Sequence, residues 1–502
     1  MYPIEYLWRA AERYPDRAAV ISPDATLSFR QLRSAVLERA ADLTQRDPQP
    51  GSRVCVGAAN SVDHLLTILA VLAAAKVWIP LNPRNGDPEL RRQIEFVGRA
   101  LVVLDEGMRA RVGDACQDSL AMDALGQSVG SEAIALGPDS IQCIDPEQPQ
   151  AIKFTGGTTG FPKGVLQPMR AWSCNIASQI HELGLGPADR YLVAAPLTHG
   201  TSTYMLPVLG AGGALVFPAD SKPAGLLDAA EQHHVTLCFA PPTLIMALCE
   251  QQQIRARTLA SLRYLIYGGA PMRPEQIRRA QAVFGPVVCT SFGQTEAPQI
   301  ITFLAPSDMQ GERLASVGRP SLMTRVAILD EQGNVLPVGQ EGEVAVRGNL
   351  VMSAYLDAPE ETARTLVKGW LRTGDAGVLD EQGYLYLRDR LRDVIISGGF
   401  NVYPSDVEVV LCAHPDVAEC AVVGIPHDKW GEAVHAAVRL KEGAHFDAAA
   451  LIEHVKKELG SVKTPKEIHR VAELPRSAVG KVLKSAVREQ ILVKGAQHAA
   501  LH

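Results

Sequence analysis

The stretch from Phe154 to Gly164 has the composition of a loop that binds phosphate groups. Its four glycines and three threonines in eleven residues cannot pack a core, but they let backbone N–H groups and hydroxyls come close to a polyanion. Lys163 lies between Pro162 and Gly164, whereas the Walker loop needs Gly before its Lys and Ser or Thr after it. Apolar, strand-like runs precede and follow the stretch. We therefore predict a strand–loop–strand phosphate site, with a solvated Gly/Thr turn as the alternative reading.

Three further polar or Gly-rich segments each follow a predicted strand. They are Pro-Leu-Thr-His-Gly at 196–200, Gly-Gly-Ala-Pro at 268–271 and Ser-Phe-Gly-Gln-Thr-Glu at 291–296. The strands are predicted at 190–195, 263–267 and 287–290. In a doubly wound sheet, the carboxyl ends of parallel strands line one crevice. We therefore expect His199 and the other two segments to lie near one another.

The C-terminal half holds three shorter motifs whose residues, taken singly, could be ordinary surface residues. They are Thr-Gly-Asp at 373–375, Asp-Arg-Leu-Arg-Asp at 389–393 and Gly-Lys at 480–481. Lys481 comes directly before a helix that we predict at 482–491. A cation at a helix N-terminus is electrostatically unfavourable unless it faces an anion, so we expect Lys481 to face one.

Together these seven motifs resemble the adenylate-forming enzymes, which include acyl-CoA synthetases, luciferase-like enzymes and the adenylation domains of peptide synthetases. Their order and spacing agree with that family along nearly the whole chain. The commonest family version of the phosphate loop has Ser where this chain has Gly156, a change that removes one hydroxyl and keeps the backbone donors. The resemblance implies a two-step reaction: a carboxylate displaces pyrophosphate from ATP, and a thiol then attacks the acyl-adenylate.

The resemblance also implies roles for individual residues. Lys481 matches the lysine that bridges the substrate carboxylate and the α-phosphate, Thr295 matches the residue that holds the α-phosphate, and Glu296 matches the Mg²⁺ ligand. The positions implied to be catalytic are Lys481, Thr295, Glu296 and His199. Those implied to bind ATP or coenzyme A are Thr155, Gly156, Gly157, Thr158, Thr159, Gly160, Lys163, Gly269, Ala270, Pro271, Ser291, Phe292, Gly293, Asp375, Arg390, Gly398, Gly399 and Gly431. Arg392 is implied to lie at the hinge between the domains.

Several of these implied roles have a simple chemical reason. Phe292 stands where the family usually has Tyr, and it keeps the aromatic face that stacks on adenine. Asp375 is implied to accept both ribose hydroxyls, with Arg390 assisting. A carboxylate such as Glu296 is the hard oxygen ligand that Mg²⁺ prefers, and the ammonium of Lys481 neutralises charge that develops during adenylation. The implied cofactors and co-substrates are ATP, Mg²⁺ and coenzyme A.

The elements that must position these motifs alternate between strands and helices over residues 4–290. Such alternation indicates parallel βαβ units, although we predict no regular structure for 105–149. From about residue 316 to 389, short strands with frequent turns indicate a β-barrel-like part. Beyond the 389–393 motif, mixed strands and helices indicate a small α+β domain.

We therefore predict an α/β fold in two domains. Residues 1–391 form an adenylation domain of doubly wound parallel sheets with the β-barrel-like part, and residues 392–502 form a mobile domain that carries Lys481. Segments 397–401 and 430–432 resemble the walls of the tunnel through which pantetheine reaches the acyl group. Their glycines leave room for it.

Composition excludes several other classes of protein. The 502 residues carry a net charge of −6 with no Lys/Arg-rich run, so nothing suggests nucleic acid. The nine cysteines show no C-x-x-C pair, which is typical of a reduced cytosolic enzyme. The start lacks a secretion signal, and the longest apolar run, Leu65–Ala75, is too short to cross a bilayer. We expect a cytoplasmic protein without a transmembrane segment, and a homodimer stays open.

The segment at 198–203 bears on the substrate. Amino-acid-activating members of the family usually carry an Asp there, whereas this chain has Thr-His-Gly-Thr-Ser-Thr. His199 and the uncharged segment 201–205 resemble the wall and gate of an acyl pocket. We therefore favour an AMP-forming acyl-CoA synthetase for a largely apolar monocarboxylic acid, fatty or aryl.

Two alternatives stay open from the sequence. One is an acyl-AMP ligase that loads a carrier protein, which thiol-dependent AMP release with free coenzyme A would separate from a synthetase. The other is a non-catalytic sensor of nucleotides or acyl-adenylates on the same fold. Retention of Thr295, Glu296, Asp375 and Lys481 disfavours the sensor, because a protein that only binds would not need all four.

Overall fold

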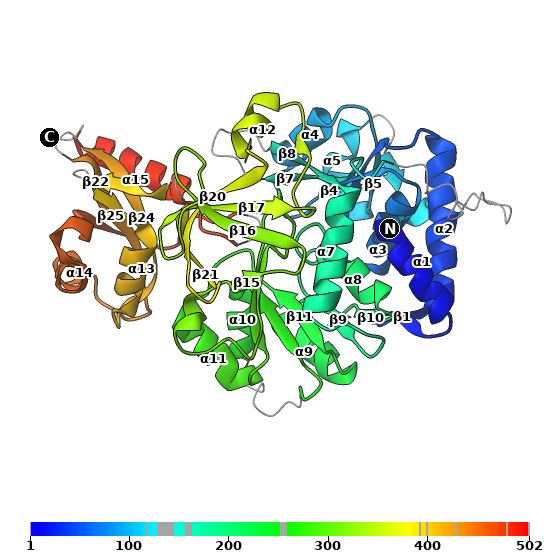
Figure 1. Cartoon of the computed structure of the whole chain (residues 1–502), viewed down its shortest axis with the longest axis horizontal. Helices are drawn as coiled ribbons and strands as arrows, with labels where there is room; N and C mark the ends of the chain where they lie inside the picture. Colours follow the sequence, from blue (N-terminus) through cyan, green and yellow to red (C-terminus); the bar gives the residue numbers. More distant parts are fainter. Residues whose placement is uncertain are drawn as a thin grey trace. The chain divides into compact units, whose positions relative to one another are not determined.

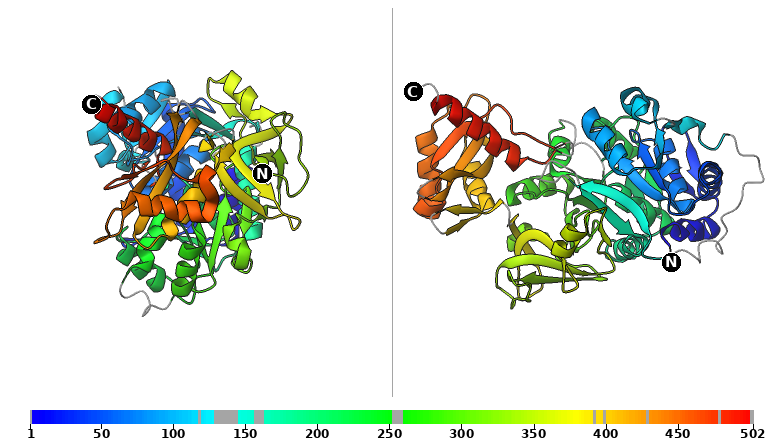
Figure 2. Two further views of the ribbon diagram at one scale, coloured as in Figure 1. Left: turned by 90° about the vertical axis from the view of Figure 1, so that its left-hand side faces the viewer. Right: turned by 90° about the horizontal axis from the view of Figure 1, so that it is seen from above.

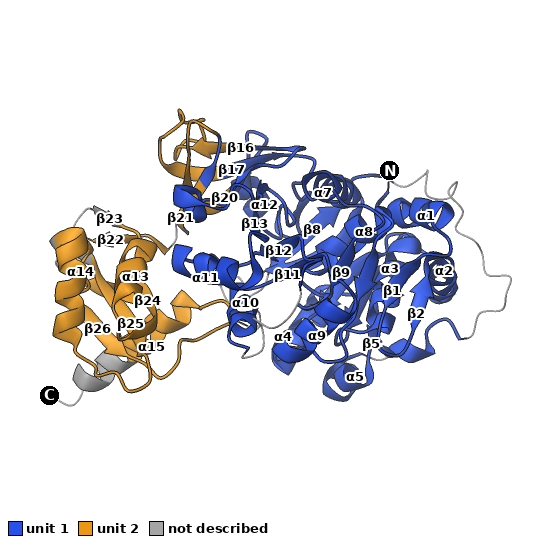
Figure 3. Cartoon of the chain, turned by 90° about the horizontal axis from the view of Figure 1, so that it is seen from below, with its two compact units in different colours: residues 1–326, 345–372, 383–385 blue, residues 327–344, 373–382, 386–502 orange. Residues whose placement is uncertain are grey.

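The computed structural model describes residues 2–116, 119–127, 145–155, 163–251, 259–390, 393–397, 400–427, 430–477 and 480–499. The chain divides into two compact units, coloured separately in Figure 3. The first unit holds residues 1–326, 345–372 and 383–385, and the second holds 327–344, 373–382 and 386–502. The domain boundary between residues 391 and 392 stays a prediction.

One mixed sheet of the first unit runs in the order β15-β14-β13-β12-β11-β9-β10-β1-β2 in the described residues. Its strands are β1 (Ala18–Ile21), β2 (Thr26–Ser28), β9 (Arg190–Leu192), β10 (Ala214–Val216), β11 (Leu237–Ala240), β12 (Tyr264–Tyr267), β13 (Val288–Phe292), β14 (Thr302–Leu304) and β15 (Arg319–Pro320). From β13 to β1 the pairings are parallel, and the outer strands are antiparallel. Nearly all of the central residues are buried, as expected for a parallel sheet covered on both faces.

A second mixed sheet runs in the order β18-β8-β7-β4-β3-β5-β6. Its strands are β3 (Arg53–Gly57), β4 (Val77–Leu81), β5 (Ala100–Leu104), β6 (Ser119–Ala121), β7 (Pro149–Thr155), β8 (Lys163–Pro168) and β18 (Ala354–Tyr355). Strands β7 and β8 form an antiparallel hairpin on either side of the phosphate-loop sequence, with Thr155 paired to Lys163. The described ends of the stretch thus agree with the predicted strand–loop–strand unit.

Helices of the first unit cover these two sheets. They are α1 (Pro3–Arg13), α2 (Phe29–Arg46), α3 (Val62–Ala73), α4 (Asp87–Phe96), α5 (Glu106–Val112), α7 (Met169–Glu182), α8 (Ser202–Gly210), α9 (Pro223–Gln232), α10 (Pro242–Cys249), α11 (Pro274–Phe284) and α12 (Pro359–Thr365). Short 3₁₀ turns span Gly113–Ala115, Met122–Ala124 and Gly311–Ala315. Figure 1 shows α7 and α8 beside α1 and α3, where side chains of both sheets and these helices form one large core.

A third, largely antiparallel sheet has the order β16-β17-β20-β19, with β21 paired to β20. Its strands are β16 (Thr324–Leu329), β17 (Gly342–Gly348), β19 (Leu366–Val367), β20 (Trp370–Leu379) and β21 (Leu385–Arg390). The division between the two units runs through β16, β17, β20 and β21. These strands form the barrel-like part that the frequent turns predicted.

The remainder of the second unit is a small α/β domain. Its elements are β22 (Ile395–Ser397), β23 (Phe400–Val402), α13 (Pro404–Ala413), β24 (Val417–His427), β25 (Gly431–Leu440), α14 (Ala448–Lys463), β26 (Glu467–Arg470) and α15 (Lys484–Ala499). Figure 2 shows α15, in red, lying along the strands of this sheet. Val487 and Ile491 of α15 pack against alternate residues of β24, which explains why the strand presents small or branched residues on that face.

Two predictions about elements are wrong. Residues 106–112 form helix α5 and residues 119–121 form β6, within the stretch predicted to be irregular. Helix α15 begins at Lys484 and not at residue 482, so Lys481 lies in a turn before the helix and the helix-dipole argument does not apply to it. Among the described helices, none is both long and apolar enough to cross a membrane.

Candidate active site

The carboxyl ends of four neighbouring strands carry the polar segments that the sequence singled out. Strands β9, β11, β12 and β13 are consecutive in their sheet and pair in parallel. His199 follows β9, whereas Ser291 and Phe292 end β13. The turn of Gly269, Ala270 and Pro271 follows β12, and Gly269 has a φ of 77° that favours glycine. The segments therefore share one edge of the sheet, as predicted.

The turns after β9 and β12 meet at the ring of Phe239. A Cβ atom added to Gly200 would lie 2.7 Å from that ring, and one added to Gly268 would lie 2.9 Å from it. Phe239 in turn stacks on Tyr204 of α8, with ring centroids 5.4 Å apart. The two turns thus form one continuous, aromatic-backed wall.

A neutral polar network lies beside this aromatic stack. Gln299 Nε2 donates to the Tyr204 hydroxyl and to Ser291 Oγ, both at 2.9 Å, while Thr203 Oγ1 donates to Gln299 Oε1 at 3.1 Å. Gln299 has a φ of 64°, a left-handed conformation that is uncommon outside glycine and that clusters at functional sites. A Cβ atom on Gly293 would lie 2.5 Å from the Gln299 backbone, so the β13 turn and residue 299 touch.

The Thr295–Glu296 turn is braced by side chains and backbone from distant parts of the first unit. Gln167 of β8 is buried, and its Nε2 donates to the Thr295 carbonyl at 2.7 Å. Its Oε1 accepts from Trp172 Nε1 at 3.1 Å, which fixes the amide orientation. The Met352 N–H donates to the Glu296 carbonyl at 2.7 Å. Both residues of the turn are therefore held by the hairpin β7–β8 and the segment that leads into β18.

The side chains of Glu296 and Lys163 belong to one cluster around Tyr355. The Tyr355 hydroxyl donates to Glu296 Oε1 at 2.8 Å, and Lys163 Nζ lies 5.3 Å from the centroid of the Tyr355 ring. Lys163 also forms an ion pair with Glu361 of α12. Burial, followed by the nearby negative charge of Glu296, raises the pKa of Tyr355, which keeps its hydroxyl a donor. The structure thus brings together the predicted phosphate-loop lysine and the predicted metal ligand.

His199 is held as a neutral imidazole. Its Nδ1 lies 2.9 Å from Thr198 Oγ1. Burial, with additional repulsion from the cations Lys153 and Arg84, lowers the pKa of His199 to about 4. At neutral pH the imidazole therefore adds no charge to the wall of the site.

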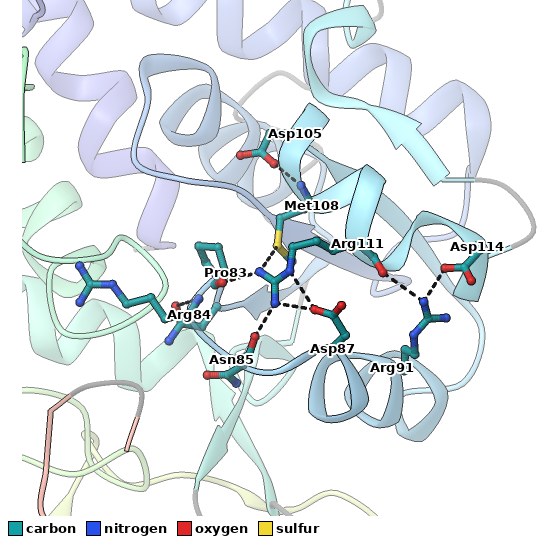
Figure 4. Close-up of polar contacts among 10 residues, drawn as sticks. Pro83, Arg84, Asn85, Asp87, Arg91, Asp105, Met108, Arg111 and Asp114 are labelled. Carbon is teal, nitrogen blue, oxygen red and sulfur yellow. Dashed lines mark hydrogen bonds and ion pairs between the residues drawn. The ribbon is translucent and has the colours of Figure 1, made fainter. Parts of the chain in front are cut away.

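Arg84, one of these two cations, lies on a turn that Arg111 of α5 holds in place. The Arg111 guanidinium donates to the carbonyls of Pro83 at 2.5 Å and Asn85 at 2.6 Å, and it pairs with Asp87 (Figure 4). Figure 4 shows Arg84 pointing away from this cluster. The turn was not singled out from the sequence, because its brace lies in the stretch predicted to be irregular.

Lys153 is a second cation that sequence reasoning missed. It lies in the run Ala151–Phe154, predicted as an apolar strand, and its side chain is only 8% exposed. Its Nζ donates to Ser202 Oγ at 3.0 Å and lies over the rings of Trp78 and Trp172, at 4.8 and 5.4 Å from their centroids. Burial lowers the pKa of this amine to about 7. A lysine inside an otherwise apolar run was the signal available in the sequence.

The predicted ribose-binding residues lie in the second unit. Asp375 is in β20, where its N–H donates to Thr373 Oγ1 at 3.1 Å. The preceding Gly374 has a φ of 72°, and its N–H donates to Glu343 Oε1 at 3.0 Å. Arg390 is the last residue of β21. The Thr-Gly-Asp motif is thus a segment of β20 with a left-handed glycine, and Glu343 of β17 holds it in place.

Lys481 lies in a compact turn of the second unit and is exposed. The Ser477 N–H donates to the Lys481 carbonyl at 2.8 Å, and the Lys481 N–H donates to Ser477 Oγ at 3.2 Å. Arg476 Nη1 donates to the Gly480 carbonyl at 2.9 Å, and Gly480 has a φ of 83°. Ser477, four residues before Lys481, thus bonds both the N–H and the carbonyl of the Lys481 backbone.

Gly431 is the first residue of β25 and pairs with Ser397 of β22 and His427 of β24. It is therefore held where three strands of the small domain meet. Several predicted positions lie outside the described residues: Gly156, Gly157, Thr158, Thr159, Gly160, Arg392, Gly398 and Gly399.

Most of the chain matches two protein-family models. Residues 7–356 match the model of the AMP-binding enzymes, and residues 406–481 match the model of the C-terminal domain of those enzymes. This chain belongs to the AMP-binding enzyme family. It is an adenylate-forming enzyme, as its motifs indicated, and its α/β fold is that of the family.

Individual relatives include acid–CoA ligases with different acids. The medium/long-chain-fatty-acid–CoA ligase FadD8 of Mycobacterium tuberculosis is 37% identical over 409 residues, which cover 78% of this chain and 71% of the relative. Feruloyl-CoA synthase of an Amycolatopsis species is 33% identical, over 95% of this chain and 98% of the relative.

Solved structures give close spatial matches. The amide bond synthetase McbA from Marinactinospora thermotolerans aligns with a TM-score of 0.88 at 33% identity, covering 97% of this chain and 99% of McbA. The o-succinylbenzoate coenzyme A synthetase MenE from Bacillus subtilis, in complex with ATP and magnesium, aligns with a TM-score of 0.86 at 28% identity, covering 95% of this chain and 98% of MenE.

Proposed function

We propose that this chain is an AMP-forming acyl-CoA synthetase for a largely apolar monocarboxylic acid, fatty or aryl. In the first half-reaction a carboxylate oxygen of the acid attacks the α-phosphorus of ATP, and pyrophosphate leaves. In the second, the coenzyme A thiol attacks the acyl carbonyl and AMP leaves. The observation that carries the proposal is the ordered set of seven motifs, within a chain that both family models match.

The residues of the first unit suit ATP and Mg²⁺. Thr155 to Gly160 and Lys163 would cradle the phosphates, with Lys163 exchanging its Glu361 partner for a phosphate oxygen. Glu296 would be the Mg²⁺ ligand, since it is a hard oxygen donor whose Oε1 is oriented by Tyr355. When bound, Mg²⁺ would neutralise charge on the phosphates. The similar MenE was solved in complex with ATP and magnesium, which supports these two ligands for this chain.

The remaining nucleotide contacts follow from the motifs. Phe292 would stack on adenine, Asp375 would accept the ribose hydroxyls with Arg390 assisting, and Thr295 would hold the α-phosphate. The turn of Gly269, Ala270 and Pro271 would border the nucleotide together with Ser291 and Gly293. Support comes from the shared strand-end edge that carries the residues of the first unit.

The mobile domain, residues 392–502, would serve the two half-reactions in two orientations about Arg392. In the first orientation Lys481 would neutralise charge between the acid's carboxylate and the α-phosphate. In the second, Gly398, Gly399 and Gly431 would leave room for pantetheine. The proposal is supported by the hydrophobic clusters of the small α/β domain, whose described members all lie between Ile395 and Ile491.

The acid would lie against the wall that His199, Tyr204 and Phe239 form. Its aromatic stack and neutral polar network favour an uncharged body, and the neutral His199 adds no charge. The relatives themselves span fatty and aryl acids, so this wall must be tested for both.

The test is a panel of fatty, aryl, dicarboxylic and amino acids, assayed for ATP-dependent pyrophosphate release with and without coenzyme A. We expect release with fatty or aryl monocarboxylates, AMP formation that requires coenzyme A, and loss of both after chelation of Mg²⁺. Preference by kcat/KM for dicarboxylic or amino acids would contradict the proposal. AMP release with an amine acceptor but not with coenzyme A would favour an amide synthetase, the activity of the similar McbA. The cytoplasmic location and the homodimer stay predictions.

A further inference from the structure

Two lysines of the first unit are buried, and they differ in how their ammonium groups are satisfied. Lys76 is 1% exposed, and its Nζ donates to the Asp47 carbonyl, the Gln49 carbonyl and Ser52 Oγ at 2.6, 3.3 and 2.7 Å. An ammonium has three N–H donors, so that group is complete. Lys153 is 8% exposed and donates to Ser202 Oγ alone among the described residues. Two of its donors are left without a protein acceptor there.

The two N–H donors of Lys153 that lack a protein acceptor within the described ranges reduce the stability of the folded state. Burying a charged amine is unfavourable unless it is paired and hydrogen-bonded, and no ion pair joins Lys153 to a carboxylate in the described part of the chain. The faces of Trp78 and Trp172 compensate only in part. A methionine of similar length would fill the same space without this cost. Retention of the amine therefore points to an acceptor that the protein does not itself supply.

The neighbours of Lys153 place this acceptor near the acid and not at the ATP phosphates. Its hydrogen-bond partner, Ser202 Oγ, also donates to the His199 carbonyl at 2.6 Å and begins helix α8, which continues into Thr203 and Tyr204 of the acid wall. The phosphate loop already has its own cation, Lys163, which lies on β8, the antiparallel partner of the strand that carries Lys153. Lys163 contacts Glu361 and Tyr355. Lys153 and Lys163 thus serve different surroundings on one hairpin.

We propose that Lys153 is a specificity-determining residue that donates hydrogen bonds to an oxygen-bearing substituent of the acid, remote from the carboxylate that reacts. The preferred substrate is then a largely apolar monocarboxylic acid that carries a hydroxyl or keto group, and not a plain hydrocarbon acid. This inference rests on the proposed function, because it takes the wall of His199 and Tyr204 to face the acid.

The experiment compares matched pairs of acids that differ only in this substituent, such as straight-chain acids with and without a keto group and aryl acids with and without a ring hydroxyl. For the wild-type enzyme, kcat/KM in pyrophosphate release should favour the substituted member of at least one pair by about 10- to 100-fold, the usual range for a hydrogen bond to a charged group. In Lys153→Met the same ratio should fall to about 1, while Tm stays equal or rises. Because deprotonation weakens the donor, the wild-type ratio should also fall as the pH rises above about 7.

Lys76→Met is the matched control. It removes a buried amine whose three acceptors are then left unpaired, so it should lower Tm while the wild-type selectivity ratio is retained. If Lys153→Met does not fold, the pH dependence of the wild-type ratio is the deciding measurement.

The outcomes separate this inference from the function on which it rests. Absence of pyrophosphate release with every acid contradicts the proposed function. Release with equal kcat/KM for both members of every pair, or a ratio unchanged in Lys153→Met and across pH, overturns the role of Lys153 alone. A rise in KM for ATP that is the same for all acids, without a change in the ratio, would assign the amine to the nucleotide and would also overturn it.

Discussion

The Thr295–Glu296 turn and the Lys481 turn carry two of the predicted catalytic functions, and different units of the chain brace them. The first receives contacts from Gln167, Met352 and Tyr355 of the first unit, which lie far from it in sequence. The second has backbone contacts from Ser477 and a bond from Arg476 to the Gly480 carbonyl, and Arg476 is in turn paired with Glu419 of β24 in the second unit.

This difference fits a reaction in two half-steps. In the proposed mechanism, the groups assigned to phosphate and metal would keep one geometry throughout, whereas Lys481 would serve the first half-step and leave room in the second. Bracing within the second unit would let the Lys481 turn keep its shape in both half-steps.

The largest effect should come from Lys481→Ala. Without the cation that faces the developing charge, adenylation measured as pyrophosphate release should slow by about 10²–10³ or more. With pre-formed acyl-AMP and coenzyme A, the same variant should form thioester at a near-normal rate.

The reciprocal variant is Gly431→Trp, at the meeting point of β22, β24 and β25. It should form acyl-AMP normally and lose thioester formation, because its side chain fills the space assigned to pantetheine. Equal loss of both half-reactions in both variants would be incompatible with two orientations.

The next effect should come from Gln167→Leu. Leucine leaves the Thr295 carbonyl and Trp172 Nε1 unpaired in a buried place, at a cost of about 1–3 kcal/mol for each group. The displaced turn should lower kcat for adenylation by about tenfold, and the free energy of unfolding should fall as well. Gln148→Leu is the control, since Gln148 bonds the Ala75 carbonyl away from the turn. An unchanged kcat for adenylation in Gln167→Leu would mean that the Thr295–Glu296 turn keeps its conformation without the bond from Gln167.

A smaller effect is expected from Glu361→Gln. The triphosphate must displace Glu361 from Lys163, and both side chains are about one third exposed, so screening limits the pair to about 1 kcal/mol or less. The KM for ATP should therefore fall by up to about fivefold. Glu360→Gln, which loses only the ion pair with Arg364, should leave this KM unchanged. A rise in KM would instead show that Glu361 orients the lysine.

The smallest effect should come from Arg476→Ala. Its bond to the Gly480 carbonyl and its ion pair with Glu419 are partly exposed, and partly exposed contacts of this kind contribute about 1 kcal/mol at most. Adenylation should slow by less than about fivefold, and thioester formation from acyl-AMP should not change. A loss as large as that of Lys481→Ala would show that local bracing is not sufficient for the lysine turn.

Much of the framework could be predicted from the sequence, because strands with clear apolar runs and flanking turns carry their own signal. The strands predicted at 263–267 and 287–290 are observed at Tyr264–Tyr267 and Val288–Phe292, close to the predicted bounds. Shorter elements were missed: α5 has seven residues and β6 has three, too few for a period to stand out. The start of α15 was placed too early, because an isolated bridge between Arg476 and Val482 extends the turn.

The contacts that brace the site could not be predicted in the same way. Gln167 of β8 meets Thr295 across 128 residues of sequence, and Tyr355 of β18 meets Glu296 across 59, so only the tertiary fold brings these pairs together. Motif matching finds residues that bind substrate, and it does not find the residues that hold them. Lys153 was missed for a different reason. It lies within an apolar run that predicts a buried strand, and its own charge was not considered as a sign of function.

The close approach of Gly200 and Gly268 to the Phe239 ring has a consequence for engineering the enzyme. The backbone on both sides of the ring leaves no room for a Cβ atom, so no substitution of these glycines can enlarge the site. A variant library aimed at bulkier acids should therefore shorten Phe239 or Tyr204 and leave both turns untouched. In the proposed acid site, a change at a single aromatic position would widen or narrow the range of acids that are accepted, without altering the residues assigned to the nucleotide.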